Sequence, residues 1–128
     1  MGWLQRLGFG AAPLPPRDAL LNEGLALAMD WGENWLAPIQ DRLRASHPQL
    51  TLAALDELDA TCRAAMKSGH ETVLTLVHAK GKAVVEADFA PLFLAAHPWA
   101  SAENVARLFG QSLYYAWKSG GPATSKPS

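Results

Sequence analysis

The sequence predicts an all-α protein, a compact four-helix antiparallel bundle whose first helix is kinked. Three observations lead to this prediction. Apolar residues recur with the period of an α-helix in four stretches, helix-capping residues and helix-stop signals separate these stretches, and the connections between them are short. Short connections place helices that are neighbours in sequence antiparallel. The chain has 128 residues, of which 49% are apolar and 18% charged, as expected for one globular domain.

The first predicted helix covers residues 18–46. It begins at Asp18, whose negative charge suits the positive end of the helix dipole. Pro38 lacks an amide hydrogen and crowds the carbonyl group of the preceding turn, so we expect a kink there. His47-Pro48 ends the helix, because the residue before a proline disfavours helical backbone.

The second predicted helix covers residues 51–80 and begins at Thr51, a good capping residue. Its apolar phase is unbroken across Ser68-Gly69. We therefore expect one long helix, straight or bent at the glycine, and a break at Gly69 is the alternative. Gly81 between two lysines is a typical helix end.

Two shorter helices are predicted after it. One covers residues 88–97 with Asp88 as its cap, and the other covers 101–119 with Ser101 as its cap. In the last helix we expect three polar residues to face outward: Arg107, Gln111 and Lys118.

A local pattern occurs twice. His47-Pro48, a helix and then Lys-Ser-Gly recur as His97-Pro98, a helix and Lys-Ser-Gly, about 50 residues later. The recurrence suggests a degenerate duplication of a helical hairpin. The alternative is that both elements are ordinary helix-stop signals, which commonly have this composition.

We expect a helical domain at residues 17–120, flanked by an apolar, proline-rich arm at 1–16 and by a flexible tail at 121–128. In a single helical turn, three apolar side chains of the arm would share one face: Trp3, Leu4 and Leu7. They either tuck back onto the domain, dock on a partner or lie loosely on a membrane surface. Docking on a second copy would make the chain a homo-oligomer through the arm.

Charge and composition exclude several classes of function. The net charge is −1 and no helix is predominantly basic, so we expect no nucleic-acid partner. No run approaches the roughly 20 apolar residues that span a bilayer, so we expect no membrane span. The single cysteine, Cys62, suits a reducing compartment, and we expect a cytoplasmic, bacterial protein.

Catalytic and metal-binding patterns are lacking in the sequence. No Glu-x-x-His pair occurs, and His70-Glu71 has leucine at position 74 where a zinc-protease motif needs its second histidine. Cys62 lies on an apolar stripe, which predicts a buried small hydrophobe and not a nucleophile. We therefore expect no catalytic residue, no metal and no cofactor.

Aromatic residues are the unusual feature, because five tryptophans occur in a short chain. Most fit buried helix stripes. Trp99, Tyr114 and Tyr115 do not all fit, because Trp99 lies in a connection and adjacent tyrosines point about 100° apart on a helix. Exposed Trp and Tyr dominate partner-binding surfaces. The alternative is that Trp99 covers the end of the bundle and the tyrosine hydroxyls reach water.

The sequence thus favours a non-enzymatic protein that binds a protein partner, of the adaptor, regulator or toxin-neutralising type. Its predicted contact residues are Trp99, Tyr114 and Tyr115, together with Trp3, Leu4 and Leu7 of the arm. The alternative is a small-ligand-binding or enzymatic helical domain with an aromatic-lined pocket. That pocket would use Trp31, Trp35 and Trp117, with polar groups from Glu33 or His70.

Overall fold

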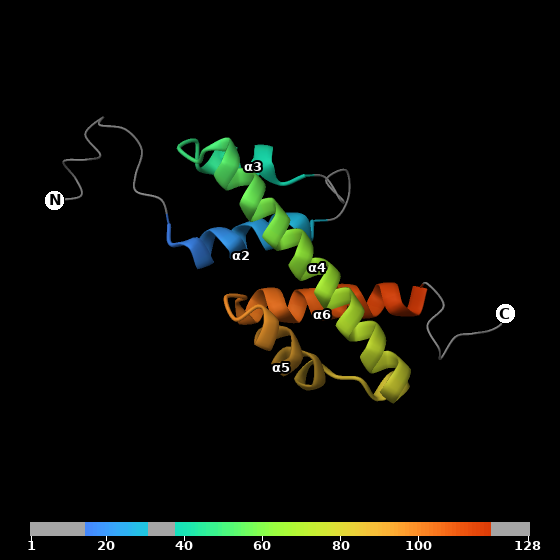
Figure 1. Ribbon diagram of the computed structural model, residues 1–128. Coiled ribbons are helices and arrows are strands. Elements are labelled where there is room, and N and C mark those ends of the chain that lie inside the picture. The colour runs from blue at the N-terminus through green and yellow to red at the C-terminus, as the bar shows by residue number, and fades with distance from the viewer. Residues whose placement is uncertain (1–14, 31–37, 119–128) are drawn as a thin grey trace.

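The computed structural model describes residues 15–30 and 38–118, and they form helices and connecting turns with no strand. The five α-helices of this part are α2 (Arg17–Ala28), α3 (Gln40–Ser46), α4 (Leu52–Lys80), α5 (Glu86–Ala96) and α6 (Ala102–Lys118), shown in Figure 1. A 3-10 turn, Gly81–Ala83, follows α4. The predicted all-α class is confirmed.

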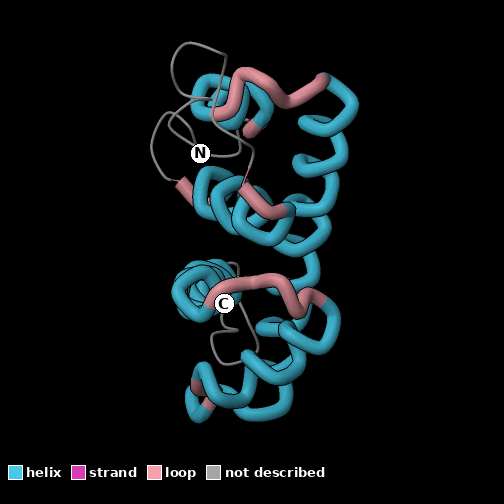
Figure 2. Tube along the Cα trace, turned by 90° about the vertical axis from the view of Figure 1, so that its left-hand side faces the viewer, coloured by secondary structure: helices cyan, strands magenta, loops and turns pink. Residues whose placement is uncertain are grey.

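Helix α4 is the central helix and packs against the other four described α-helices. It has 29 residues and runs without a break through Gly69, as the unbroken apolar phase predicts. α2 and α3 lie against its first half, and α5 and α6 lie against its second half, so the side view in Figure 2 shows two groups of helices joined by α4.

The long helices do not alternate in direction. Asn104 near the start of α6 bonds Asn22 in the middle of α2, and Gln111 further along α6 bonds Met29 at the end of α2. Position along one helix therefore increases with position along the other, so α2 and α6 run parallel, as Figure 1 also shows. The short helices α3 and α5 are the return segments, each antiparallel to the helix that follows it.

The four-helix antiparallel bundle with a kinked first helix is therefore not confirmed. The sequence predicts one helix over 18–46, whereas the structure has α2 ending at Ala28 and α3 beginning at Gln40. The prediction of antiparallel neighbours holds for the hairpins α3–α4 and α5–α6. It fails for the long helices, because α3 lies between α2 and α4 in the sequence and α5 lies between α4 and α6.

The core is continuous along α4. Its largest fully buried side chains come from every described helix, and they include Leu21, Leu43, Leu55, Leu108, Phe89 and Phe93. At the crossing of α4 and α6, a Cβ added to Gly69 would lie 2.6 Å from Leu108 Cδ2. Glycine at this position allows the two helices to approach each other closely.

The two His-Pro turns have the same local structure. His47 ends α3 with φ −134° and ψ 74°, and His97 ends α5 with φ −134° and ψ 67°. Each histidine carbonyl accepts a backbone hydrogen bond three residues later, at 3.0 and 3.1 Å. Thr51 Oγ1 and Ser101 Oγ then cap the next helix in the same way, at 3.1 and 3.2 Å. The caps are as expected, and the duplication itself stays a prediction.

The start of α5 differs from the prediction by two residues. The helix begins at Glu86, and Asp88 caps it from within the first turn by accepting the amide hydrogen of Val85 at 3.0 Å. Lys80 Nζ lies 2.8 Å from the same carboxylate. These two contacts lower the pKa of Asp88.

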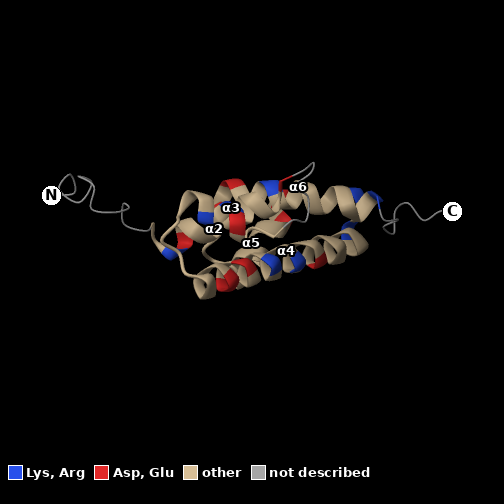
Figure 3. Ribbon diagram, turned by 90° about the horizontal axis from the view of Figure 1, so that it is seen from above, with Lys and Arg blue, Asp and Glu red and all other residues tan. Residues whose placement is uncertain are grey.

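The surface of the described helices carries mixed charge. In Figure 3, acidic and basic residues are interspersed along α4. None of the described helices is long and apolar enough to cross a membrane. Trp3, Leu4 and Leu7 of the predicted arm and the predicted tail at 121–128 lie outside the described residues.

Candidate functional site

Three surface hollows lie along the C-terminal half of α6. The first, the His70 pocket, has a volume of about 110 Å³ and is lined by His70, Leu74, Ser112, Tyr115 and Ala116. The second, the Trp117 pocket, has about 290 Å³ and is lined by Lys82, Val84, Leu113 and Trp117. The third, the Tyr114 groove, has about 410 Å³ and is lined by Arg107, Gly110, Gln111 and Tyr114.

The Tyr114 groove presents a fixed aromatic side chain. Tyr114 is 50% exposed. Its ring meets Tyr115 edge-on, with the centroids 5.4 Å apart, and Lys118 Nζ lies 5.5 Å from its centroid. Lys118 Nζ also donates to the Tyr114 hydroxyl at 3.4 Å. The contacts with Tyr115 and Lys118 restrict the rotamers of the ring, so an incoming group loses little entropy in ordering it.

The other wall of the groove is anchored to the end of α2. Gln111 Nε2 donates to Met29 O at 3.0 Å, and Arg107 lies within 3.5 Å of Met29 O and Asp30 Oδ1. Gln111 is only 6% exposed, so the prediction that it faces outward is wrong. Its amide is buried because it satisfies a carbonyl at the C-terminus of α2, where helices leave such groups unpaired.

Gly110 lies in the groove, in the interior of α6. A Cβ at this position would meet no heavy atom of the described residues within 4 Å. Glycine costs about 1 kcal/mol relative to alanine in a helix interior. Packing within the described part of the chain therefore gives no reason for a glycine here, in contrast to Gly69.

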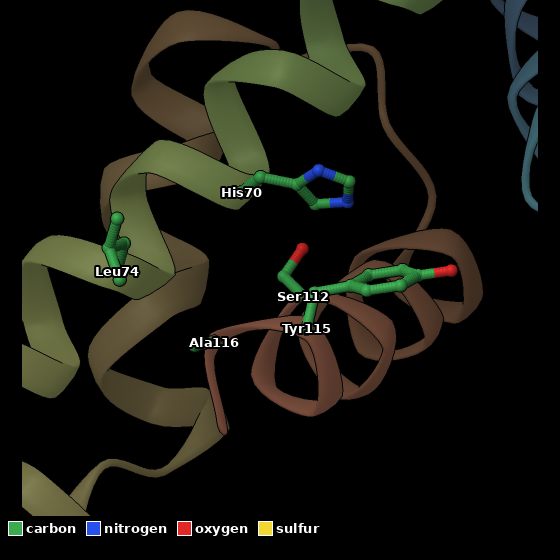
Figure 4. Close-up of a pocket in the computed structure, with 5 residues that line it drawn as sticks. All are labelled: His70, Leu74, Ser112, Tyr115 and Ala116. Atoms are coloured by element: carbon green, nitrogen blue, oxygen red, sulfur yellow. The ribbon is translucent and has the colours of Figure 1, made fainter. Parts of the chain in front are cut away.

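The His70 pocket holds two buried polar atoms without a protein partner in the described structure, His70 Nε2 and Ser112 Oγ. Figure 4 shows the Ser112 hydroxyl pointing from α6 toward the imidazole of His70 on α4. The Tyr115 ring lies 5.7 Å from the imidazole, centroid to centroid. Burial lowers the pKa of His70, so the imidazole is neutral at pH 7.

The Trp117 pocket lies on another side of α6. Its tryptophan and Leu113 are half-buried against the core, and Val84 is 7% exposed. Lys82 is its one charged lining residue in the described part of the chain. The pocket is therefore an apolar surface with a single cationic edge.

The structure brings together four of the predicted site residues around α6: Tyr114, Tyr115, His70 and Trp117. Tyr114 and Tyr115 belong to the predicted partner-binding surface, and His70 and Trp117 belong to the predicted ligand pocket. His70 and Trp117 line different hollows, so they do not share one aromatic pocket in the described structure. The remaining residues of that predicted pocket, Trp31, Glu33 and Trp35, lie outside the described residues.

Trp99 lies at the opposite end of α6. It is half-buried against the core, and its ring meets that of His97 edge-on at 6.1 Å. Its carbonyl accepts a hydrogen bond from Asn22 Nδ2 at 2.8 Å. The structure thus separates Trp99 from the tyrosines with which the sequence grouped it.

Among the lining residues that sequence reasoning did not assign to a site are Arg107, Gly110 and Ser112. Gly110 carried a usable signal, because a glycine inside an amphipathic helix is unfavourable and needs a reason. Ser112 carried none, since a small residue on a buried stripe is ordinary.

Metal binding and thiol chemistry have no support in the described residues. No group of three or more His, Cys, Asp or Glu side chains there is placed to hold an ion. Cys62 is fully buried, as predicted, and burial raises the pKa of its thiol to about 12. The thiolate that nucleophilic chemistry requires is therefore not populated near neutral pH.

Comparison with known proteins adds no relative, because the chain matches no family model, no curated protein and no solved structure.

Proposed function

We propose that this chain is a non-enzymatic binding protein that takes an acidic helical segment of a protein partner along the Tyr114 groove of α6. A cytoplasmic adaptor, regulator or toxin-neutralising protein would act in this way. The observation that carries the proposal is the exposed Gly110 beside the half-exposed, fixed ring of Tyr114.

Shape supports a helical occupant. The absence of a side chain at Gly110 opens the groove between Arg107 and Tyr114, whose residues lie on one face of α6 at helical spacing. A partner helix can approach the α6 backbone closely at the glycine and pack its side chains against the tyrosine. Tyrosine is among the residues that most often dominate binding energy at such a centre.

Charge supports an acidic occupant. Arg107 and Lys118 lie near the two ends of the groove face, about three helical turns apart. Asp30 pairs with Arg42 at 3.0 Å and, less closely, with Arg107 at 3.5 Å. Two guanidinium groups thus share one carboxylate at one end of the groove face, and the Lys118 ammonium group lies at the other end, which favours a partner helix with carboxylates flanking an apolar centre.

Affinity measurements on the full-length chain test the proposal. The chain is used to capture a partner from its native cells, and the purified partner is then titrated by calorimetry against variants. Tyr114→Ala removes the aromatic group, and Gly110→Gln fills the groove with a helix-favouring side chain. Each is expected to weaken binding about 30-fold, the typical effect of a hot-spot residue. Neither change lowers the melting temperature by more than a few degrees.

Leu92→Ala is the matched control. Leu92 is a large apolar residue of α5 that is 55% exposed, comparable with Tyr114. Truncating it should leave partner affinity unchanged. Wild-type affinity in both groove variants would refute the groove as the binding surface, and a captured partner without an acidic helical segment would refute its chemistry.

A further inference from the structure

We propose that the His70 pocket is a second, separate site, which binds a small uncharged molecule through a hydroxyl group, of the short aliphatic alcohol class. This site does not depend on the Tyr114 groove. It is built from α4 and α6, whose crossing places His70 and Ser112 opposite each other (Figure 4).

The first argument is the hydroxyl of Ser112. Thr61, Thr72 and Thr75 on α4 each donate to the carbonyl oxygen four residues earlier, at 2.8–3.0 Å. Ser112 is 2% exposed and its hydroxyl makes no hydrogen bond in the described structure. Such a buried, unpaired hydroxyl is unfavourable, and alanine would fit the same space. A bound molecule that pairs with the hydroxyl removes this cost.

The second argument is the pairing of the two polar atoms. His70 Nε2 is also buried without a partner in the described residues. One ligand hydroxyl satisfies both atoms at once, because it donates its hydrogen to the imidazole nitrogen and accepts the hydrogen of Ser112. With the imidazole hydrogen on Nδ1, so that Nε2 accepts, a group that only accepts hydrogen bonds pairs with the Ser112 hydroxyl but leaves Nε2 unpaired.

The lining determines the charge and size of the ligand. No Asp, Glu, Lys or Arg is among the described residues that line the pocket, and Leu74, Ala116 and the Tyr115 ring provide apolar walls. The volume of about 110 Å³ is smaller than the roughly 150 Å³ of an engineered cavity that holds benzene. An uncharged molecule of roughly three to five heavy atoms therefore fits, with its alkyl chain toward the half-exposed Leu74.

The probe is 1-propanol, titrated into the purified full-length chain labelled with ¹⁵N-histidine. Propionitrile is the matched control ligand, because it has the same number of heavy atoms and accepts hydrogen bonds but cannot donate one. The expected result is a saturable shift of the His70 imidazole resonances with 1-propanol and a response at least tenfold weaker with propionitrile.

Ser112→Ala and His70→Phe are the informative variants. Each should weaken 1-propanol binding about tenfold, the usual effect of removing one hydrogen bond in a buried site. Ser112→Ala removes an unpaired hydroxyl and is expected to fold normally, so it keeps the test valid if His70→Phe does not fold. Ser46→Ala, at the end of α3, is the control and should leave binding unchanged.

Three outcomes would overturn the proposal. The first is an absence of saturable 1-propanol binding, and the second is equal binding of propionitrile. The third is a direct hydrogen bond between Ser112 and His70, or a single buried water between them, that persists at saturating 1-propanol. Because no protein partner enters this experiment, its failure is distinct from failure of the groove proposal.

Discussion

Substituting alanine for Gly69 and for Gly110 should have opposite effects on stability. Both glycines are in helix interiors, so each substitution gains about 1 kcal/mol of helix propensity. At Gly110 nothing in the described structure opposes that gain. Gly110→Ala should therefore raise the free energy of unfolding by up to about 1 kcal/mol.

Gly69→Ala adds a methyl group at the crossing of α4 and α6. The new Cβ would lie 2.6 Å from Leu108 Cδ2 and 3.0 Å from Leu108 Cγ. Leu108 is fully buried, so its side chain has little room to rotate away. Overpacking of this kind costs about 1–3 kcal/mol. After the propensity gain, we expect a net loss of about 1 kcal/mol, or a fall in melting temperature of about 3–5 °C.

The assay is chemical denaturation of the two variants alongside wild type, followed by circular dichroism at 222 nm. A double-mutant cycle isolates the steric contribution. Leu108→Ala alone should cost about 2–5 kcal/mol, because it leaves a cavity. In that background the Gly69 substitution should become stabilising, because the clashing atoms are gone. The reasoning is refuted if Gly69→Ala stabilises the wild-type chain as much as Gly110→Ala does, or if the cycle shows no coupling.

Three further predictions concern buried polar groups. Asn22→Ala should lower the free energy of unfolding by about 2–3 kcal/mol in denaturant titrations, since it leaves the 5%-exposed Asn104 amide without its side-chain partner; an effect below 0.5 kcal/mol would contradict this. Burial lowers the pKa of His70 and His97, so stability is complete above about pH 6.5 and falls as the pH drops through the lowered values. Melting temperatures from pH 7.5 to 5 check the sign, and the fall should shrink in His97→Leu. Iodoacetamide should label Cys62 only as fast as the chain unfolds, because burial holds its thiol pKa at about 12; fast labelling of the folded chain would refute this.

The sequence alone determined much of the local structure of the described residues, although it joined α2 and α3 into one helix. The long helix through Gly69, the Thr51 and Ser101 caps and the His-Pro stops follow from interactions within a few residues of each other. Such short-range preferences are readable from the order of residues. The burial of Cys62 followed in the same way from its position on an apolar stripe.

Only the tertiary structure decided how the helices run and what they bring together. The parallel course of α2 and α6 depends on hydrogen bonds such as Gln111 to Met29, between residues far apart in the chain. Helical periodicity predicts which face of a helix is buried but not which other helix covers it. It therefore neither placed Ser112 opposite His70 nor separated Trp99 from Tyr114. It also gave no way to distinguish the two glycines of α4 and α6. The Leu108 side chain leaves no room for a Cβ at Gly69, whereas no described residue lies within 4 Å of a Cβ at Gly110.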